Sequence, residues 1–167
     1  LSDCIIGNFS YIKPFSLVEG SKIGENSFIG PYGRIRPEST IEDDVEIGNF
    51  VEIKSSFISS KCRINHHSFI GDATLDQNVT IGAGTITCNH DGNKINNIHI
   101  ERDSYVGSNC SLVAPLKIKK NSTIGAGSTI TKNVPKDALT IARSKQVSIK
   151  NWKGPRSTVP LDKLKKK

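Results

Sequence analysis

The 167-residue sequence contains no run of 18 apolar residues, so no segment of it is expected to span a membrane as a helix. Its first 20 residues lack a basic start followed by an apolar block and therefore do not resemble a secretory signal peptide. Aromatic residues make up only 6% of the chain and do not alternate with basic residues, which argues against a surface that stacks nucleic-acid bases. Because the first residue is Leu rather than Met, we expect the chain to be part of a longer protein.

The signatures of disulfide and zinc sites are also missing. None of the four cysteines, Cys4, Cys62, Cys88 and Cys110, forms a CxxC pair. Three of them stand two residues before an apolar residue of the repeat described below, at a position that favours small side chains. We therefore expect small buried thiols, no metal site, and a reducing cytoplasmic environment.

The net charge is +7, and part of it lies in the terminal lysines Lys163 and Lys165–Lys167. A basic balance can indicate nucleic acid, a membrane surface or phosphorylated ligands as partners. The lysine run is most simply a solvated tail, so we expect neither nucleic acid nor a membrane as a partner.

An apolar residue recurs at every sixth position. From Ile23 to Ile53, and again from Ile100 to Ile130, each sixth residue is Ile, Leu or Val, and we call these residues the markers. A period of six is neither helical nor that of a simple alternating strand, and it indicates a repeat architecture. The markers define 21 hexads, and their phase slips by one residue only after multiples of three hexads. Three hexads per turn over about seven coils predict an all-β, triangular parallel β-helix. We take it to be left-handed because hexapeptide repeats of this class are left-handed.

Two further features complete the predicted fold. A Gly often follows the marker, as at Gly7, Gly48 and Gly107, and we expect it to supply the unusual dihedrals of a tight corner. The step from Thr87 to Ile100 is 13 residues instead of six, which predicts an extruded loop over residues 88–99. Such loops often carry binding sites, although a tolerated surface loop is the alternative. We expect the β-helix domain to cover residues 1–133, and a closing strand and extended basic tail to cover residues 134–167.

Stacking of the coils places distant residues together. Arg36 and Lys54 follow markers 18 residues apart and are expected in one corner, ~4.8 Å apart along the axis. Two cations at this spacing repel each other unless they share an anion, and Arg with Lys suits a phosphate. The alternative is a pair of solvated corner residues.

A second column contains a histidine. The second residue after the marker on the following side is Pro31, Asn49, His66, Ala83, Ser108 and Ala126 in successive coils. Small residues beside a histidine suggest a narrow groove for an extended ligand, with His66 as a general base near neutral pH. Glu52 lies one turn away and is a candidate to orient the imidazole. A surface histidine and an exposed carboxylate are the alternatives.

The motifs in these stretches resemble a known family. They include Gly48-Asn-Phe-Val-Glu52-Ile-Lys54, Ile81-Gly-Ala-Gly-Thr-Ile-Thr-Cys-Asn89 and Leu112-Val-Ala-Pro115. The chain is similar, through Arg143, to the acetyltransferase (C-terminal) domain of the bifunctional bacterial N-acetylglucosamine-1-phosphate uridyltransferase / glucosamine-1-phosphate acetyltransferases. The nucleotidyltransferase half of that family is absent from this chain.

This resemblance implies acetyl transfer from acetyl-CoA, used as a co-substrate, to the 2-amino group of glucosamine-1-phosphate. It implies His66 as the base, assisted by Glu52, and Arg36 and Lys54 as ligands of the sugar phosphate. It further implies a homotrimer with sites shared between subunits, and a product used for UDP-N-acetylglucosamine, peptidoglycan and lipopolysaccharide synthesis. The positions that match the family's acetyl-CoA contacts are Ala83, Asn89, His90, Ser108, Ala126 and Arg143.

The chain departs from the family pattern at the sugar site. Phe69 replaces a Tyr and Thr80 replaces an Asn, both of which are sugar ligands in the family. The loop lysine is shifted by one residue to Lys94, with Ile95 in its place, and His90 replaces a Tyr. His67 follows His66 and is a rival base that should face the other way. We therefore expect activity with an altered substrate affinity.

Three other functions remain open on the sequence. Another hexapeptide acyltransferase would keep His66 but need no cations at Arg36 and Lys54. A zinc hydratase would use His66, His67 and His90 as metal ligands. A scaffold without catalysis would need none of these residues.

Overall fold

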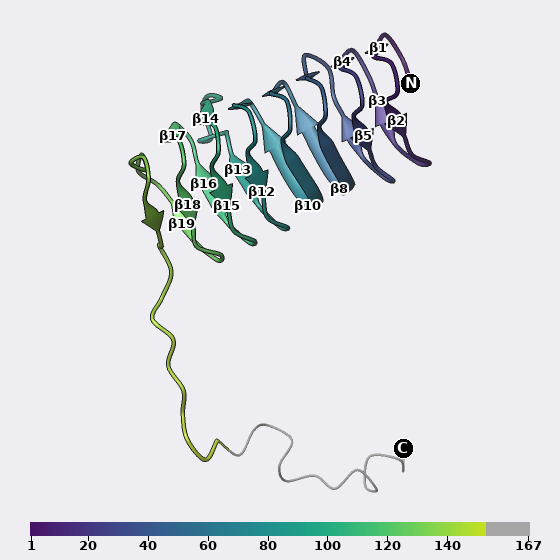
Figure 1. The fold of residues 1–167 in the computed structure, drawn as a ribbon. Coiled ribbons are helices and arrows are strands. Elements are labelled where there is room, and N and C mark those ends of the chain that lie inside the picture. The colour runs from purple at the N-terminus through teal and green to yellow at the C-terminus, as the bar shows by residue number, and fades with distance from the viewer. Residues whose placement is uncertain (153–167) are drawn as a thin grey trace, which may run out of the picture.

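Residues 1–152, which a computed structural model describes, form a prism of short parallel strands (Figure 1). No helix of this described part is long and apolar enough to cross a membrane. The strands stack along the axis on three sides, so the predicted parallel β-helix is confirmed.

The first and third sides each hold seven strands, and the second side holds eight, in agreement with about seven predicted coils. The first side contains β1 (Ile5–Ile6), β4 (Lys22–Ile23), β7 (Thr40–Ile41), β9 (Phe57–Ile58), β11 (Ala73–Leu75), β14 (Ile98–Ile100) and β17 (Leu116–Ile118). The second side contains β2 (Tyr11–Ile12), β5 (Phe28–Ile29), the first parts of β8 (Glu46–Lys54) and β10 (Arg63–Gly71), β12 (Thr80–Ile81), β15 (Tyr105–Val106), β18 (Thr123–Ile124) and β20 (Leu139–Thr140). The third side contains β3 (Leu17–Val18), β6 (Arg34–Ile35), the second parts of β8 and β10, β13 (Ile86–Cys88), β16 (Ser111–Val113) and β19 (Thr129–Ile130).

The markers form the core. Ile29, Ile35, Ile47, Ile53 and Ile64 are each fully buried, and their register partners are the markers of the adjacent coil. Burial of one such side chain contributes about 1.5–3 kcal/mol, so the stack of markers is the main source of stability. The period of six therefore reports which side chain of each short strand points inward.

Small residues fill the position two before the marker, as predicted for the cysteines. Cys62 and Cys110 are buried there, and Cys4 and Cys88 are partly buried free thiols. Burial raises the pKa of the Cys62 thiol to about 11, so it stays protonated and unreactive near neutral pH. Ser27 holds an equivalent position and uses its hydroxyl to donate to the Glu42 carbonyl at 2.9 Å. These side chains satisfy corner backbone groups from inside the prism.

The expectation that the Gly after a marker supplies unusual dihedrals holds at Gly30, which has a φ of 90°, but is wrong at Gly7, Gly48 and Gly107. The left-handed backbone falls on the third residue after the marker and is taken there by Asn26, Asp44 and Asn78, among others. Gly7, Gly48 and Gly107 directly follow markers and are not among the residues with positive φ. A Cβ on Gly48 would lie 1.8 Å from the Asn65 carbonyl oxygen. At Gly48, glycine is needed because the next coil passes too close for a side chain.

The predicted loop and closing strand are both present. Residues 89–97 leave the prism between β13 and β14, and His90 and Ile95 pair across the loop in an antiparallel bridge. Strand β20 pairs with β18 and ends the second side. The chain then leaves the prism as an extended segment (Figure 1). The predicted basic tail at Lys163 and Lys165–Lys167 lies outside the described residues.

The stacking constraint yields a stability prediction. Gly48→Ala should lower the free energy of unfolding by at least about 2 kcal/mol, because the neighbour of the added methyl group is backbone. The matched control is Gly125→Ala, which places a methyl group 2.9 Å from Cγ1 of Ile141, a side chain that can move. We expect the control to cost about 1 kcal/mol or less. Urea unfolding midpoints measure both changes, and equal losses would contradict this account of the glycines.

Candidate active site

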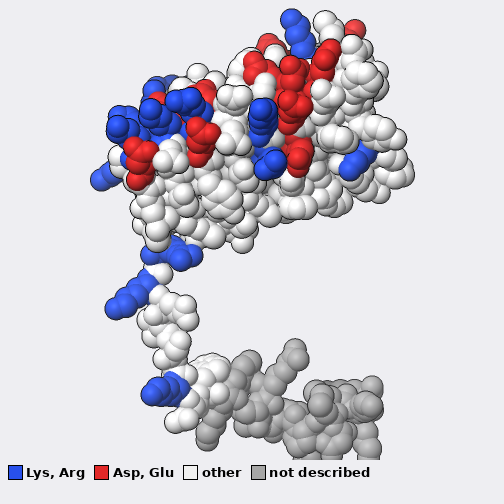
Figure 2. Space-filling model, in the orientation of Figure 1, with Lys and Arg blue, Asp and Glu red and all other residues white. Residues whose placement is uncertain are grey.

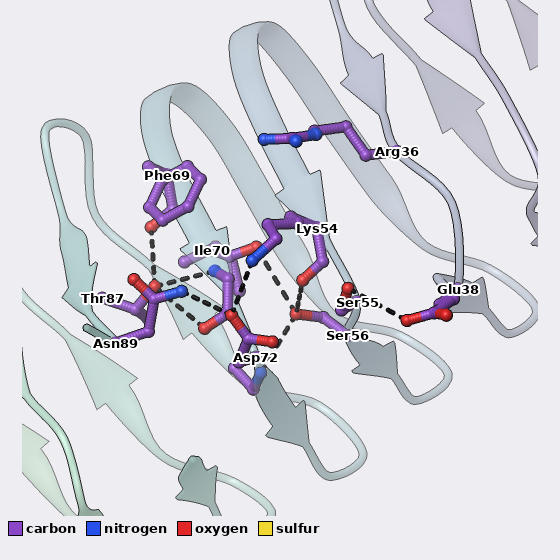
Figure 3. Close-up of polar contacts among 12 residues, drawn as sticks. Arg36, Glu38, Lys54, Ser55, Ser56, Phe69, Ile70, Asp72, Thr87 and Asn89 are labelled. Carbon is purple, nitrogen blue, oxygen red and sulfur yellow. Dashed lines mark hydrogen bonds and ion pairs between the residues drawn. The ribbon is translucent and has the colours of Figure 1, made fainter. Parts of the chain in front are cut away.

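One cluster of polar residues lies where the third side turns into the first. We call it the Lys54 corner and define it as Arg36, Lys54, Asp72 and Asn89, which stand at or just after the ends of third-side strands in successive coils (Figure 3). Lys54 Nζ lies 3.2 Å from Asp72 Oδ2, and the Asn89 amide donates to the same carboxylate oxygen. The Asp72 side chain is only 12% exposed. Asp72 therefore connects Lys54 to the first residue of the extruded loop.

Arg36 has its own carboxylate. Its Nη1 lies 2.9 Å from Oε1 of Glu52, and Arg34 lies 3.9 Å from the other oxygen of the same group. Ile35 and Ile53 are register partners, so Arg36 and Lys54 occupy adjacent coils of one corner, as predicted. Each cation is paired with an anion in the same chain, which relieves their repulsion. An incoming phosphate would have to compete with Glu52 and Asp72 for these cations.

A second cluster lies where the second side turns into the third. We call it the His66 corner and define it as Asn49, His66, Ala83, Ser108 and Ala126. Asn49 and His66 are register partners, and Nδ1 of His66 lies 3.1 Å from Oδ1 of Asn49. The stack continues through backbone hydrogen bonds from the coil that follows. The Asn109 N–H donates to the Ala83 carbonyl at 2.7 Å, and the Gly127 N–H donates to the Ser108 carbonyl at 2.8 Å. The predicted column of small residues beside a histidine is present.

Arg143 lies at the far end of this column. Its guanidinium donates to the carbonyl oxygen of Ala126 at 2.7 Å. Four exposed or partly exposed positions therefore run along the axis from His66 through Ala83 and Ser108 to Ala126, and a cation follows them. Such a line of small side chains leaves room for a long, narrow ligand that carries negative charge at one end.

Glu52 does not orient His66 within this chain. Its carboxylate bonds to Arg36, whereas the imidazole bonds to Asn49. The reason is directional: Glu52 projects from the middle of the third side, in register with Phe69, while His66 sits at the corner before it. The Asn49 contact was missed although Asn49 stands in the same column of the sequence as His66.

The two neighbouring histidines face different hollows, as predicted. His66 borders a groove of about 520 Å³ that Phe28, Tyr32 and Phe50 also line. His67 borders a hollow of about 380 Å³ together with Glu52 and Phe69. His67 has a positive φ of 43°, so the chain turns between the two residues and separates their side chains.

The other predicted site residues lie apart from both histidines. Thr80 is on the second side, in register with Arg63 and Tyr105. His90, Lys94 and Ile95 are exposed in the loop, and Nδ1 of His90 accepts from the Gly92 N–H at 3.0 Å. Residues 1–152 contain no group of three His, Cys, Asp or Glu side chains that could hold a metal ion. The three histidines that a zinc hydratase would need therefore do not converge in this chain.

The two corners are separated by the width of the third side. Five residue steps along the chain lead from His66 to Gly71, where that side ends, which corresponds to roughly 16 Å of extended strand. A ligand of the size of a monosaccharide phosphate is much shorter than this. The backbone separation alone exceeds its length, but the Arg36 guanidinium reaches inward from the corner to Glu52 in the middle of the third side.

The chain matches known transferases in sequence. Residues 20–55 and 97–132 match the family model described as bacterial transferase hexapeptide (six repeats). The chain is 54% identical over 156 residues to the bifunctional protein GlmU of Nitrosospira multiformis, covering 93% of this chain and 34% of that protein. It is 50% identical to GlmU of Nitrosomonas europaea with the same coverages. The chain thus spans about a third of the length of these relatives.

Solved structures with the same fold are more distant in sequence. PerB from Caulobacter crescentus, in complex with CoA and GDP-perosamine, has a TM-score of 0.54 at 15% identity, covering 83% of this chain and 55% of that one. The acetyltransferase domain of PglB from Neisseria gonorrhoeae has a TM-score of 0.55 at 19% identity, covering 80% and 54%. At these identities the similarity establishes the fold alone.

The stability of the loop that carries Asn89, His90 and Lys94 should depend on pH through the ionisation of Asp91. Hydrogen bonds from the backbone N–H groups of Lys94 and Asn93 lower the pKa of Asp91 to about 2. Because this pKa is below the ordinary value near 3.8, the ionised Asp91 carboxylate stabilises the loop fully when the pH is above that value. The stabilisation is lost as the pH falls toward 2 and the carboxylate is protonated. An NMR titration of the Asp91 carboxyl, with hydrogen exchange of the two amides, measures this.

A control variant separates this effect from general acid unfolding. The Asn96 side-chain amide also donates to Asp91, at 2.9 Å. Asn96→Ala should therefore raise the pKa of Asp91 without changing the prism. A midpoint near 4 in the unmodified protein would contradict the loop geometry.

Proposed function

We propose that this chain, which is homologous over 93% of its length to one third of the bifunctional GlmU proteins, transfers acetyl from acetyl-CoA to the 2-amino group of glucosamine-1-phosphate. The observation that carries the proposal is this 54% identity, together with a His66 column and an Arg36–Lys54 pair that stack as the activity requires. The product, N-acetylglucosamine-1-phosphate, would supply UDP-N-acetylglucosamine for peptidoglycan and lipopolysaccharide in the cytoplasm.

The acceptor attacks as the neutral amine and must lose a proton as the new C–N bond forms. In our proposal, a ring nitrogen of His66 takes this proton while the amine nitrogen bonds to the thioester carbonyl carbon. The tetrahedral intermediate collapses, its C–S bond breaks, and the leaving CoA thiolate takes the proton from His66. Backbone N–H groups near Ala83 are candidates to stabilise the oxyanion. The reaction needs no covalent acyl-enzyme.

The His66 corner suits acetyl-CoA. Ala83, Ser108 and Ala126 have side chains small enough to leave a channel for the extended pantetheine arm. Arg143 lies beyond Ala126 and is placed to meet the phosphates of CoA. Asn89 and His90, at the start of the loop, are the remaining candidate contacts.

The Lys54 corner suits the sugar phosphate. Arg36 provides a planar fork and Lys54 a point charge, and both are partly exposed. Phosphate binding would release Glu52 from Arg36, which frees a carboxylate close to the acceptor. Phe69, Thr80 and Lys94 are the proposed sugar contacts. Phe69 and Thr80 each lack a polar group that the family uses there, which predicts weaker binding of the sugar.

The backbone separation of the two corners is compatible with a site shared between subunits. We propose a homotrimer in which the His66 corner of one subunit faces the Lys54 corner of the next. Glu52 of one subunit could then approach His66 of its neighbour, the role that the family resemblance implies.

The surface around the His66 corner supports such contacts. Phe15, Tyr32 and Phe50 form an exposed stack along this corner, with ring centroids 5.0 and 5.1 Å apart. Charged side chains gather along the upper edge of the face in Figure 2, and the region below them carries very few. An exposed aromatic stack of this kind is better suited to a subunit interface than to solvent.

A thiol-release assay tests the acetyl transfer. Acetyl-CoA with glucosamine-1-phosphate should release CoA much faster than acetyl-CoA with unphosphorylated glucosamine. Lys54→Ala and Arg36→Ala should each lower kcat/KM by roughly tenfold or more, because each removes a charged phosphate contact. Lys22→Ala is the control, since Lys22 lies exposed on the first side. Equal rates with the two acceptors would favour an acyltransferase with a different acceptor, and no release with either would favour a scaffold.

Mixed oligomers test the shared site. His66→Ala and Lys54→Ala homotrimers should both be strongly impaired, but each mixed trimer would contain one site with His66 and Lys54 intact. Random mixing of equal amounts should restore roughly a quarter of wild-type activity. Subunits are co-refolded or co-expressed, and the oligomer size is checked by sedimentation. Activity that stays at the level of the two homotrimers would show that each site lies within one chain.

A further inference from the structure

We infer that Asn49 is a positioning residue that fixes the neutral tautomer of His66, with the proton on Nδ1 and Nε2 left as the basic nitrogen. The tautomer follows from the geometry of this chain alone. Its catalytic consequence rests on the proposed acetyl transfer.

The position of Asn49 is set by the fold. Asn49 in β8 and His66 in β10 are register partners in adjacent coils, so their Cα atoms are held in place by the parallel pairing on both sides of the corner. Asn49 is partly buried, whereas His66 is exposed. The Ser68 hydroxyl donates to the His66 carbonyl oxygen at 2.9 Å and further fixes the backbone of the turn. The contact of 3.1 Å between Oδ1 and Nδ1 therefore joins a constrained acceptor to a more exposed ring.

Nearby carboxylates are engaged elsewhere in this chain. Glu52 bonds to Arg36 at 2.9 Å. Glu46, which borders the same groove as His66, lies 3.5 Å from Arg63 and accepts from the Asn65 amide at 3.2 Å. Lys13 and Tyr32 are the other ionisable groups that border this groove. Among residues 1–152, the amide oxygen of Asn49 is thus the side-chain group hydrogen-bonded to the imidazole of His66.

The chemistry of the contact decides the tautomer. An amide oxygen is only an acceptor, so the facing Nδ1 must carry the hydrogen of the neutral ring. Nε2 then has a free lone pair and can take a proton from an amine. The opposite tautomer, which free histidine prefers in water, has its proton on Nε2 and cannot act as a base there. A neutral amide also orients the ring without placing a formal charge beside it.

Histidine-ring NMR tests the tautomer without any substrate. Long-range ¹H–¹⁵N correlations of the ring nitrogens, assigned with a His66→Gln variant, should show Nδ1 protonated and Nε2 unprotonated near pH 8. Asn49→Ala should shift the equilibrium toward Nε2–H, and Asn49→Asp should keep Nδ1–H because it keeps an acceptor oxygen. Asn65→Ala is the matched control. It removes the same type of side chain one residue from His66, but the Asn65 amide bonds to Glu46 and not to the imidazole. Protonated Nε2 in the unmodified protein, or no response to Asn49→Ala, would overturn the inference.

Kinetics test the consequence for catalysis. Asn49→Ala should lower kcat by roughly 10- to 100-fold with the KM for acetyl-CoA little changed, and Asn49→Asp should restore most of the loss. Thermal melting checks that both variants fold. If wild-type protein transfers acetyl groups and Asn49→Ala does so equally well, the positioning role is wrong. If the tautomer responds as expected but no variant or wild-type protein transfers acetyl, the proposed function fails and the tautomer assignment stands.

Discussion

The parallel pairing of residues 17 or 18 apart is the constraint on which the rest of this structure depends. Ile5 pairs with Lys22, and Arg34 with Glu52, and a similar spacing continues through the coils except across the extruded loop, where Thr80 pairs with Tyr105. The coils stack at ~4.8 Å, which leaves no space for a Cβ after many markers. Apolar residues of every coil consequently enter one core, and outward residues fall into straight columns. Each column is a surface on which chemistry can be arranged one residue per coil.

Corners, rather than strands, carry the candidate site. A corner residue points away from the core and has neighbours directly before and after it along the axis. Charges placed there interact strongly, and the free chain balances them: Arg36 with Glu52, and Lys54 with Asp72. These pairs keep the cations in place without burying them. When a phosphate binds, the two cations would therefore exchange their carboxylate partners for the phosphate, at little cost in desolvation.

The width of one side separates the two corners and makes assembly part of the proposed mechanism. On one chain, His66 and Lys54 belong to opposite ends of the third side. The exposed aromatic stack beginning at Phe15 lies along the His66 corner, where a neighbour would cover it. The same contact that buries apolar surface would also bring a partner's cations to the histidine.

The sequence by itself determined the β-helix, the coil number, the extruded loop, and the adjacency of Arg36 with Lys54 and of His66 with its column. These follow from a periodic apolar pattern, because burial imposes a strict register on every coil. Only the tertiary structure decided why Gly48 is glycine, that Glu52 bonds to Arg36 instead of His66, and that Asn49 meets the imidazole. Those features depend on side-chain direction at corners with left-handed backbone, and on differences of a few tenths of an ångström in the distances between atoms. A repeat length specifies which residues are neighbours, but not which way their polar atoms point.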